Sequence, residues 1–185
     1  MKSRSMLFIA SFAALSTASA QKSAFKLTSA DIKEGATVPN AQVAAVMGCT
    51  GKNLSPALSW SGAPAGTKSF ALTMYDPDAP TGSGWWHWVV YNIPASATSL
   101  AAGAGDPKKN LLPAGAVQGN TDFGVPGYGG PCPPPKDKPH HYHLTLFALD
   151  TDKLDVPAGA TAAYVGFNIH AHTLAKAALN ATYGR

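Results

Sequence analysis

The segment WWHWVVYNI, residues 85–93, decides the fold class of this chain. It consists mostly of aromatic and β-branched residues, which favour strands, and it contains no charged residue. An apolar side chain at nearly every position is typical of a strand buried on both faces, so we expect it at the centre of a sheet. Because successive side chains of a strand point to opposite faces, His87 should share a face with Val89, and Trp86 with Trp88.

A second strand is expected at residues 70–75, where Phe, Leu and Met alternate with Ala, Thr and Tyr. It should end at Asp76, because Pro77 has no backbone N–H to give to a sheet.

A third strand is expected at residues 140–149, HHYHLTLFAL. Alternation places His140 and Tyr142 on one face of this strand, and His141 and His143 on the other.

The rest of the chain fits a mainly β protein. It has 18 Gly and 15 Pro but a single Glu, which is unlike a helical bundle. We expect further strands at residues 22–32 and 163–169, a short helix at 173–180 (TLAKAALN), and a long irregular segment rich in Gly and Pro at 101–139. Short strands in this context predict an antiparallel β-sandwich.

Residues 1–20 have the pattern of a secretory signal peptide. Lys2 and Arg4 precede an apolar stretch, which is followed by the small residues Ala18, Ser19 and Ala20. The stretch is too short to span a membrane. We therefore expect a single domain at residues 21–185, exported to the periplasm or secreted.

The charge excess of the chain is too small to indicate binding to nucleic acid or to a membrane surface. Without Lys2 and Arg4, 12 of the 14 basic residues remain against 10 acidic ones, a formal charge of +2. Recognition of an anion must therefore come from a local site.

Cys49 and Cys132 are the two cysteines of the chain. In an oxidising compartment a disulfide between them is expected, and two buried thiols are the alternative. On a chain-entropy model, closing a loop of this length adds roughly 4 kcal/mol at most.

The segment DPDAP, residues 76–80, places two carboxylates and two prolines at the end of the second strand. Either Asp76 and Asp78 cap backbone amides in a turn, or one of them pairs with a ligand or orients an imidazole.

The histidines allow a similar choice. His87 is either a core residue or a site residue, and four others at alternate spacing could hold a metal ion: His141, His143, His170 and His172. No nucleophile motif and no cofactor fingerprint occurs, so we expect neither an enzyme nor a cofactor.

The ordered motifs DPDAP, WWHW, GGPCPPP and PHHYHLTLFALD, with NLSPALSW at 53–60 and TYGR at the end, resemble the phosphatidylethanolamine-binding protein family. The resemblance covers residues 25–185 and is to the bacterial branch similar to Raf kinase inhibitor proteins. It implies a β-sandwich with a few short peripheral helices and a small anion pocket. Carried over by motif, the pocket residues are Asp76, His87, Gly130, Pro131, His140 and Tyr142.

One position departs from the family pattern. The family usually has Arg after the second pocket histidine, whereas this chain has His141. A histidine supplies a charge there only when protonated, so we expect the rigidity of the pocket to depend on pH near the imidazole pKa of about 6.5.

These observations together predict a non-enzymatic protein that binds phosphate or a phosphorylated head group. Two alternatives stay open: an exported inhibitor that binds a kinase, protease or other protein partner, and a His-rich metal-binding protein. A homodimer also stays open.

Overall fold

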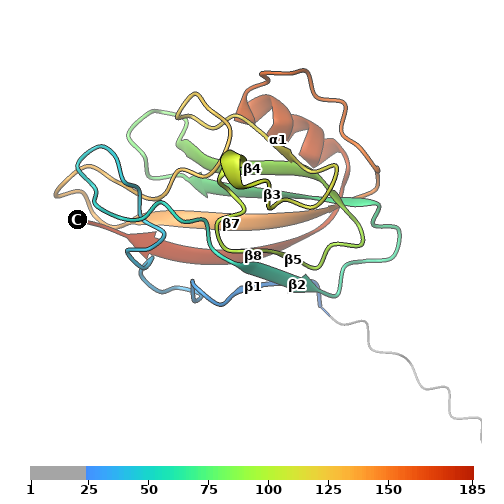
Figure 1. Ribbon diagram of the computed structural model, residues 1–185, viewed down its shortest axis with the longest axis horizontal. Helices are drawn as coiled ribbons and strands as arrows, with labels where there is room; N and C mark the ends of the chain where they lie inside the picture. The colour runs from blue at the N-terminus through green and yellow to red at the C-terminus, as the bar shows by residue number, and fades with distance from the viewer. Residues whose placement is uncertain (1–23) are drawn as a thin grey trace, which may run out of the picture.

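The structure is a computed structural model that describes residues 24–185, so the expected signal peptide lies outside the described residues. Two antiparallel sheets pack on each other in a mainly β sandwich (Figure 1), which confirms the predicted fold class. The five-stranded sheet runs in the order β6 (Val117–Gln118), β4 (Trp85–Pro94), β3 (Ser69–Asp76), β7 (His140–Leu149) and β8 (Thr173–Tyr183). The three-stranded sheet consists of β1 (Lys26–Ser29), β2 (Leu58–Ser61) and β5 (Ser99–Leu100).

The helices of residues 24–185 are the α-helix α1 (Ala162–Ala171) and the 3-10 helix η1 (Pro107–Lys109). Neither is long and apolar enough to cross a membrane. Helix α1 lies against the large sheet on the side away from β1 and β2 (Figure 1).

The main core lies between the two sheets. Trp60 of β2 meets Phe70 of β3 edge to face at 5.5 Å, and Trp88 of β4 is fully buried in the same cluster. A second apolar cluster lies beneath α1, where Val165 contacts the opposite face of the large sheet. Burial of each such side chain contributes roughly 1.5–3 kcal/mol. The central strands are therefore buried on both faces, as the run at residues 85–93 predicts.

The expected strand at residues 163–169 is wrong, because this segment forms α1. The Thr161 side chain caps its first turn by accepting a hydrogen bond from the N–H of Tyr164 at 3.2 Å. The buried residues Ala162, Val165 and Ile169 recur at helical spacing. The cap and this spacing outweigh the β-propensity of the segment.

The expected helix at residues 173–180 is also wrong, because this segment lies within β8. Ala177, Leu179 and Ala181 are buried at alternate positions, and β8 pairs with β7 along almost its whole length. Pairing with an available sheet edge overrides the helix propensity of Ala, Leu and Lys.

The predicted faces of the central strand are wrong at His87. Met74 pairs with Trp88 and Tyr75 pairs with Trp86, so His87 is an extra residue in β4. This β-bulge breaks the alternation and turns Trp86 to the helix side, away from Trp88. His87 is therefore on the side of Trp88 and of the main core, where it meets Tyr142.

Candidate functional site

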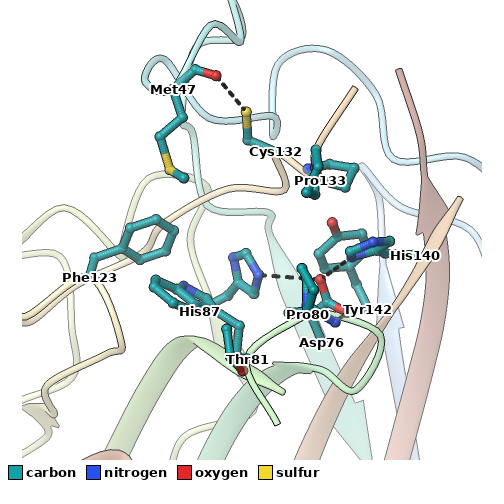
Figure 2. Close-up of a pocket in the computed structure, with 13 residues that line it drawn as sticks. Met47, Asp76, Pro80, Thr81, His87, Phe123, Cys132, Pro133, His140 and Tyr142 are labelled. Carbon is teal, nitrogen blue, oxygen red and sulfur yellow. Dashed lines mark hydrogen bonds and ion pairs between the residues drawn. The ribbon is translucent and has the colours of Figure 1, made fainter. Parts of the chain in front are cut away.

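Sheet topology brings three polar side chains to one end of the large sheet. Strand β3 ends at Asp76, and its antiparallel neighbours β4 and β7 begin at Trp85 and His140. The end of β3 therefore lies beside the beginnings of both neighbours, which places Asp76, His87 and His140 together (Figure 2).

The two carboxylate oxygens of the buried Asp76 have different partners. Oδ1 accepts hydrogen bonds from the backbone N–H groups of Asp78 (2.8 Å) and Ala79 (3.1 Å), which is a turn cap. Oδ2 lies 2.8 Å from Nδ1 of His140 and 3.9 Å from Nε2 of His87. Both interpretations of the acidic turn thus hold for Asp76, one for each oxygen.

His140 lies between two carboxylates. Its Nδ1 donates to Asp76, and its Nε2 is 3.5 Å from Oδ2 of Asp137. Burial disfavours the charged ring, but the hydrogen bond to Asp76, the negative charge of Asp76 and the hydrogen bond to Asp137 outweigh this effect and raise the pKa of His140. His140 is therefore the cationic partner of Asp76.

His87 has the opposite environment. Burial lowers the pKa of His87, although its hydrogen bond to a backbone carbonyl and the charge of Asp76 oppose the shift. Nδ1 lies 2.7 Å from the carbonyl oxygen of Gly129, and because a carbonyl only accepts, Nδ1 carries the proton. In the neutral ring Nε2 is then an acceptor, and it becomes a donor only when His87 takes up a second proton.

The Tyr142 hydroxyl has no hydrogen-bond partner among residues 24–185, although the side chain is fully buried. Burial, followed by the negative charge of Asp76, raises the pKa of this hydroxyl far above its ordinary value. It therefore stays protonated and can donate a hydrogen bond.

These four side chains line a cavity of about 170 Å³. Its other walls come from the turn after β3, from Phe123 and from the segment that contains Cys132, Pro133 and Pro134 (Figure 2). Most of these walls are apolar, so the polar groups converge on one side. The cavity is smaller than the pockets of about 300–1,000 Å³ that hold drug-sized ligands.

Gly130 and Pro131 lie behind the cavity wall and are not part of its lining. The N–H of Gly130 donates to Oδ1 of Asn53 at 2.7 Å, and the carbonyl of Pro131 accepts from Ala44. A Cβ at Gly130 would lie 2.2 Å from the carbonyl oxygen of Gln42. The glycine therefore lets two loops pack closely and leaves the wall itself to Cys132 and the prolines.

Cys49 and Cys132 form a disulfide, with their Cα atoms 6.0 Å apart. It joins the loop around Met47 to the loop around Pro133, and both of these residues line the cavity. Arg185 fastens the same loops, because its guanidinium donates to the carbonyl oxygens of Pro133 (2.8 Å) and Met47 (3.0 Å). The outer wall is thus cross-linked twice.

Three lining residues lie outside the quoted motifs, namely Met47, Thr81 and Phe123, whereas Ala79, Pro80, Pro133 and Pro134 lie within DPDAP and GGPCPPP but are not among the predicted pocket residues. The proline run and the cysteine pair signal the wall at Pro133 and Met47, but Phe123 lies in an irregular segment that has no pattern. Trp85, which also lines the cavity, belongs to the central aromatic run.

The structure does not bring together the four histidines of the metal hypothesis. His141 and His143 begin β7, whereas His170 is in α1 and His172 caps it. The backbone carbonyl of His172 accepts a hydrogen bond from the N–H of Asp150, just beyond the far end of β7 and roughly 30 Å of strand away from His141. No group of three or more metal-ligating side chains occurs within residues 24–185.

His141 lies outside the cavity and is exposed, as alternation along β7 predicts. Its backbone N–H donates to Oδ2 of Asp78 at 2.7 Å, and its Nδ1 lies 2.7 Å from the same oxygen. These two hydrogen bonds lower the pKa of Asp78. The hydrogen bonds between His141 and Asp78 therefore join the turn after β3 to the beginning of β7. Asp76 lies at the start of the same turn and lines the cavity.

Comparisons with known proteins agree on one family. The family model "Phosphatidylethanolamine-binding protein" matches residues 28–184. The Escherichia coli protein YbcL is 50% identical over 177 residues, which are 96% of this chain and 97% of YbcL. Escherichia coli YbhB is 50% identical over 158 residues, 85% of this chain and 99% of YbhB.

Solved structures show the same likeness. The crystal structure of Escherichia coli YbcL, titled a new member of the mammalian PEBP family, has a TM-score of 0.85 at 51% identity over 87% of this chain and 98% of that one. The Chlamydia trachomatis homologue CT736 has a TM-score of 0.72 at 34% identity, over 88% of this chain and 98% of that one.

Proposed function

Because the chain belongs to the phosphatidylethanolamine-binding protein family, we propose that it is an exported, non-enzymatic protein that binds a small phosphate-like anion. The ligand would be phosphate, a phosphorylated head group or a phosphorylated side chain. It would occupy the cavity lined by Asp76, His87, His140 and Tyr142.

The unpaired hydroxyl of Tyr142 carries this proposal. Leaving a buried polar group without a hydrogen bond costs about 1–3 kcal/mol. A ligand oxygen in the cavity would accept from this hydroxyl, which stays protonated at every relevant pH. The small volume of the cavity suits a phosphoryl group with few attached atoms.

The charges around the cavity make binding depend on pH. The charges of Asp76 and protonated His140 offset each other, so with neutral His87 the inner wall has no net positive charge. An anion beside His87 favours its protonated form, because the opposite charge raises the pKa that burial lowers. Nε2 then becomes a donor, and affinity rises as the pH falls.

The partners of the histidines support a binding role without catalysis. In residues 24–185 the ring nitrogens of His87, His140, His141, His143 and His172 bond to carbonyl, carboxylate or amide oxygens, and none to a hydroxyl or thiol. Nucleophilic catalysis needs a nucleophile within reach of a base. The Thr81 hydroxyl, which lines the cavity, donates to the carbonyl of Gly84.

Two features support export. The first 20 residues have the pattern of a signal peptide. The disulfide between Cys49 and Cys132 is typical of proteins that work in an oxidising compartment such as the periplasm.

Titration calorimetry with sulfate tests the proposal, because sulfate stays a dianion from about pH 5.5 to pH 8 and any pH dependence belongs to the protein. We expect tighter binding at the lower pH and loss of binding in Tyr142→Phe. His172→Gln, which removes an exposed imidazole far from the cavity, is the matched control and should bind as the native protein does. Equal affinity for sulfate at about pH 5.5 and about pH 8, or unchanged binding by Tyr142→Phe, would refute the proposed anion site.

A further inference from the structure

A second hollow adjoins the anion cavity. It has a volume of about 210 Å³, and Phe123 lines both spaces. Its walls are mainly apolar and include Val46 and Val125, which are 54% and 59% exposed. Exposed apolar side chains around a hollow, beside a ligand cavity, are a common feature of interaction sites.

A third hollow, of about 310 Å³, adjoins the second, because Asn53 and Tyr128 line both. It is lined by the exposed residues Lys52, Lys108 and Lys109, and by Asp106. Asp106 accepts the backbone N–H of Lys108, so its carboxylate is already partly occupied.

The three lysines concentrate the positive charge of the chain in one place. With Asp106 subtracted, the lining of the third hollow carries a formal charge of +2, as much as the whole of residues 21–185. The rest of residues 21–185 has no excess of positive charge, so these three lysines form a local basic cluster. Clustered charge of this kind favours association with a partner of opposite sign.

We propose that the three hollows form one docking groove for an extended segment of a partner protein. The segment has a phosphorylated side chain in the anion cavity, an apolar side chain in the second hollow, and acidic side chains at the lysines. The placement of the phosphorylated side chain depends on the proposed function of the anion cavity. The apolar contact and the lysine contacts go beyond that proposed function.

The shape of the groove favours a protein segment over a membrane. The valines and lysines line separate concave spaces, which accept single side chains, whereas membrane binding needs a continuous apolar face that enters the bilayer interface. An extended segment presents side chains along one face about 7 Å apart, so it can fill successive hollows.

Fluorescence anisotropy can test the groove with labelled peptides that carry phosphoserine at one end, a central Leu and two Glu at the other, in both chain directions and with several spacers. The test variant is Lys108→Ala/Lys109→Ala. The control is Lys68→Ala/Lys153→Ala, which removes the same charge where only backbone atoms of the two residues make hydrogen bonds. Inorganic phosphate, titrated by calorimetry into the native protein and into Tyr142→Phe, reports on the anion cavity through the part of the binding that Tyr142→Phe removes.

We expect the test variant to bind the best peptide roughly tenfold more weakly than the native protein, and to bind phosphate equally well. Val46→Ser/Val125→Ser should weaken the peptide in the same selective way. The control variant should not. Equal peptide affinity in the native protein and the lysine variant overturns the groove, as does lysine-dependent binding to phosphatidylglycerol vesicles without peptide binding. Failure of the native protein to bind phosphate would instead contradict the proposed anion pocket.

Discussion

Oδ2 of Asp76 lies 2.8 Å from Nδ1 of His140, and both side chains are buried where strands β3 and β7 meet. This pair fixes the charge of the cavity, because the carboxylate raises the pKa of His140 while burial lowers the pKa of His87. The pKa values of the two imidazoles in this cavity are thus shifted in opposite directions, upward for His140 and downward for His87.

Asp76→Asn should lower the pKa of His140. The amide oxygen can still accept the backbone N–H groups of Asp78 and Ala79, so the turn is kept while the charge beside His140 is removed. We expect a loss of about 1–3 kcal/mol in the free energy of unfolding, because a buried charged hydrogen bond is weakened. An NMR titration of the imidazole measures the shift, and an unchanged pKa would contradict the pairing.

The contribution of His140 to stability should depend on pH in a defined window. The folded protein holds the His140 proton above the ordinary pKa of 6.5, so the stabilisation is complete below about pH 6.5 and is lost as the pH rises through the raised pKa. The stability difference between the native protein and Asp76→Asn should therefore be larger at pH 6 than at about pH 9. Urea unfolding at both values tests this, and a larger difference at the higher pH would contradict it.

His87 should make the protein less stable in mild acid. Its folded pKa is below the ordinary 6.5, so the unfolded chain binds more protons and stability falls as the pH drops from about 6.5 to 5. Added sulfate should reduce this fall, since it favours the protonated ring. His87→Gln should show a flatter profile in urea unfolding over the same range. A profile as steep as that of the native protein would assign the acid sensitivity to other groups.

His141→Arg should stabilise the turn after β3 more at high pH than at low pH. Arg keeps the backbone N–H to Asp78 and brings a permanent charge to this position, whereas any histidine is charged only when it is protonated. The pair is partly exposed, so we expect a gain of at most about 1 kcal/mol. Thermal midpoints at pH 5 and pH 8 measure it, and an identical shift at both would remove the idea that His141 replaces the usual Arg in a pH-dependent way.

Removing the disulfide should affect both stability and binding. Cys49→Ser/Cys132→Ser should lower the free energy of unfolding by about 2–4 kcal/mol. Affinity for sulfate should fall as well, because Cys132 and Met47 line the cavity from the two loops that the disulfide joins. Calorimetry on the variant, and on the native protein with reductant, should agree. Full affinity in both samples would show that Arg185 alone holds the wall.

The sequence predicts the strands that build the site but not every detail of it. Strands β3, β4 and β7 follow from alternation, aromatic content and Pro77, which are local signals. Residues 163–169 form a helix and residues 173–180 a strand, which is the reverse of the prediction. The signal for β8 is not local, because Ala177 and Leu179 become strand residues only through pairing with β7. The spacing of Val165 and Ile169 and the Thr161 cap are signals that could have identified the helix.

The site also combines residues that sequence motifs predict with features that only the folded structure determines. Motif resemblance places Asp76, His87, His140 and Tyr142 together, and the cavity brings these four side chains to one wall. The β-bulge at His87 depends on the register between β3 and β4, which no single segment encodes. Gly130 lies behind the wall for a similar reason, since its position is set by close packing against Gln42.

The central claim is that Tyr142, His87 and His140 surround a bound anion, and an NMR titration tests it most directly. Phosphate, phosphoethanolamine and phosphotyrosine would each be added while the imidazole signals of His87 and His140 are followed, with the exposed His172 as internal control. We predict that at least one ligand shifts both cavity histidines, leaves His172 unchanged, and has no effect in Tyr142→Phe. Signals of His87 and His140 that do not respond to any of the three ligands would contradict the account.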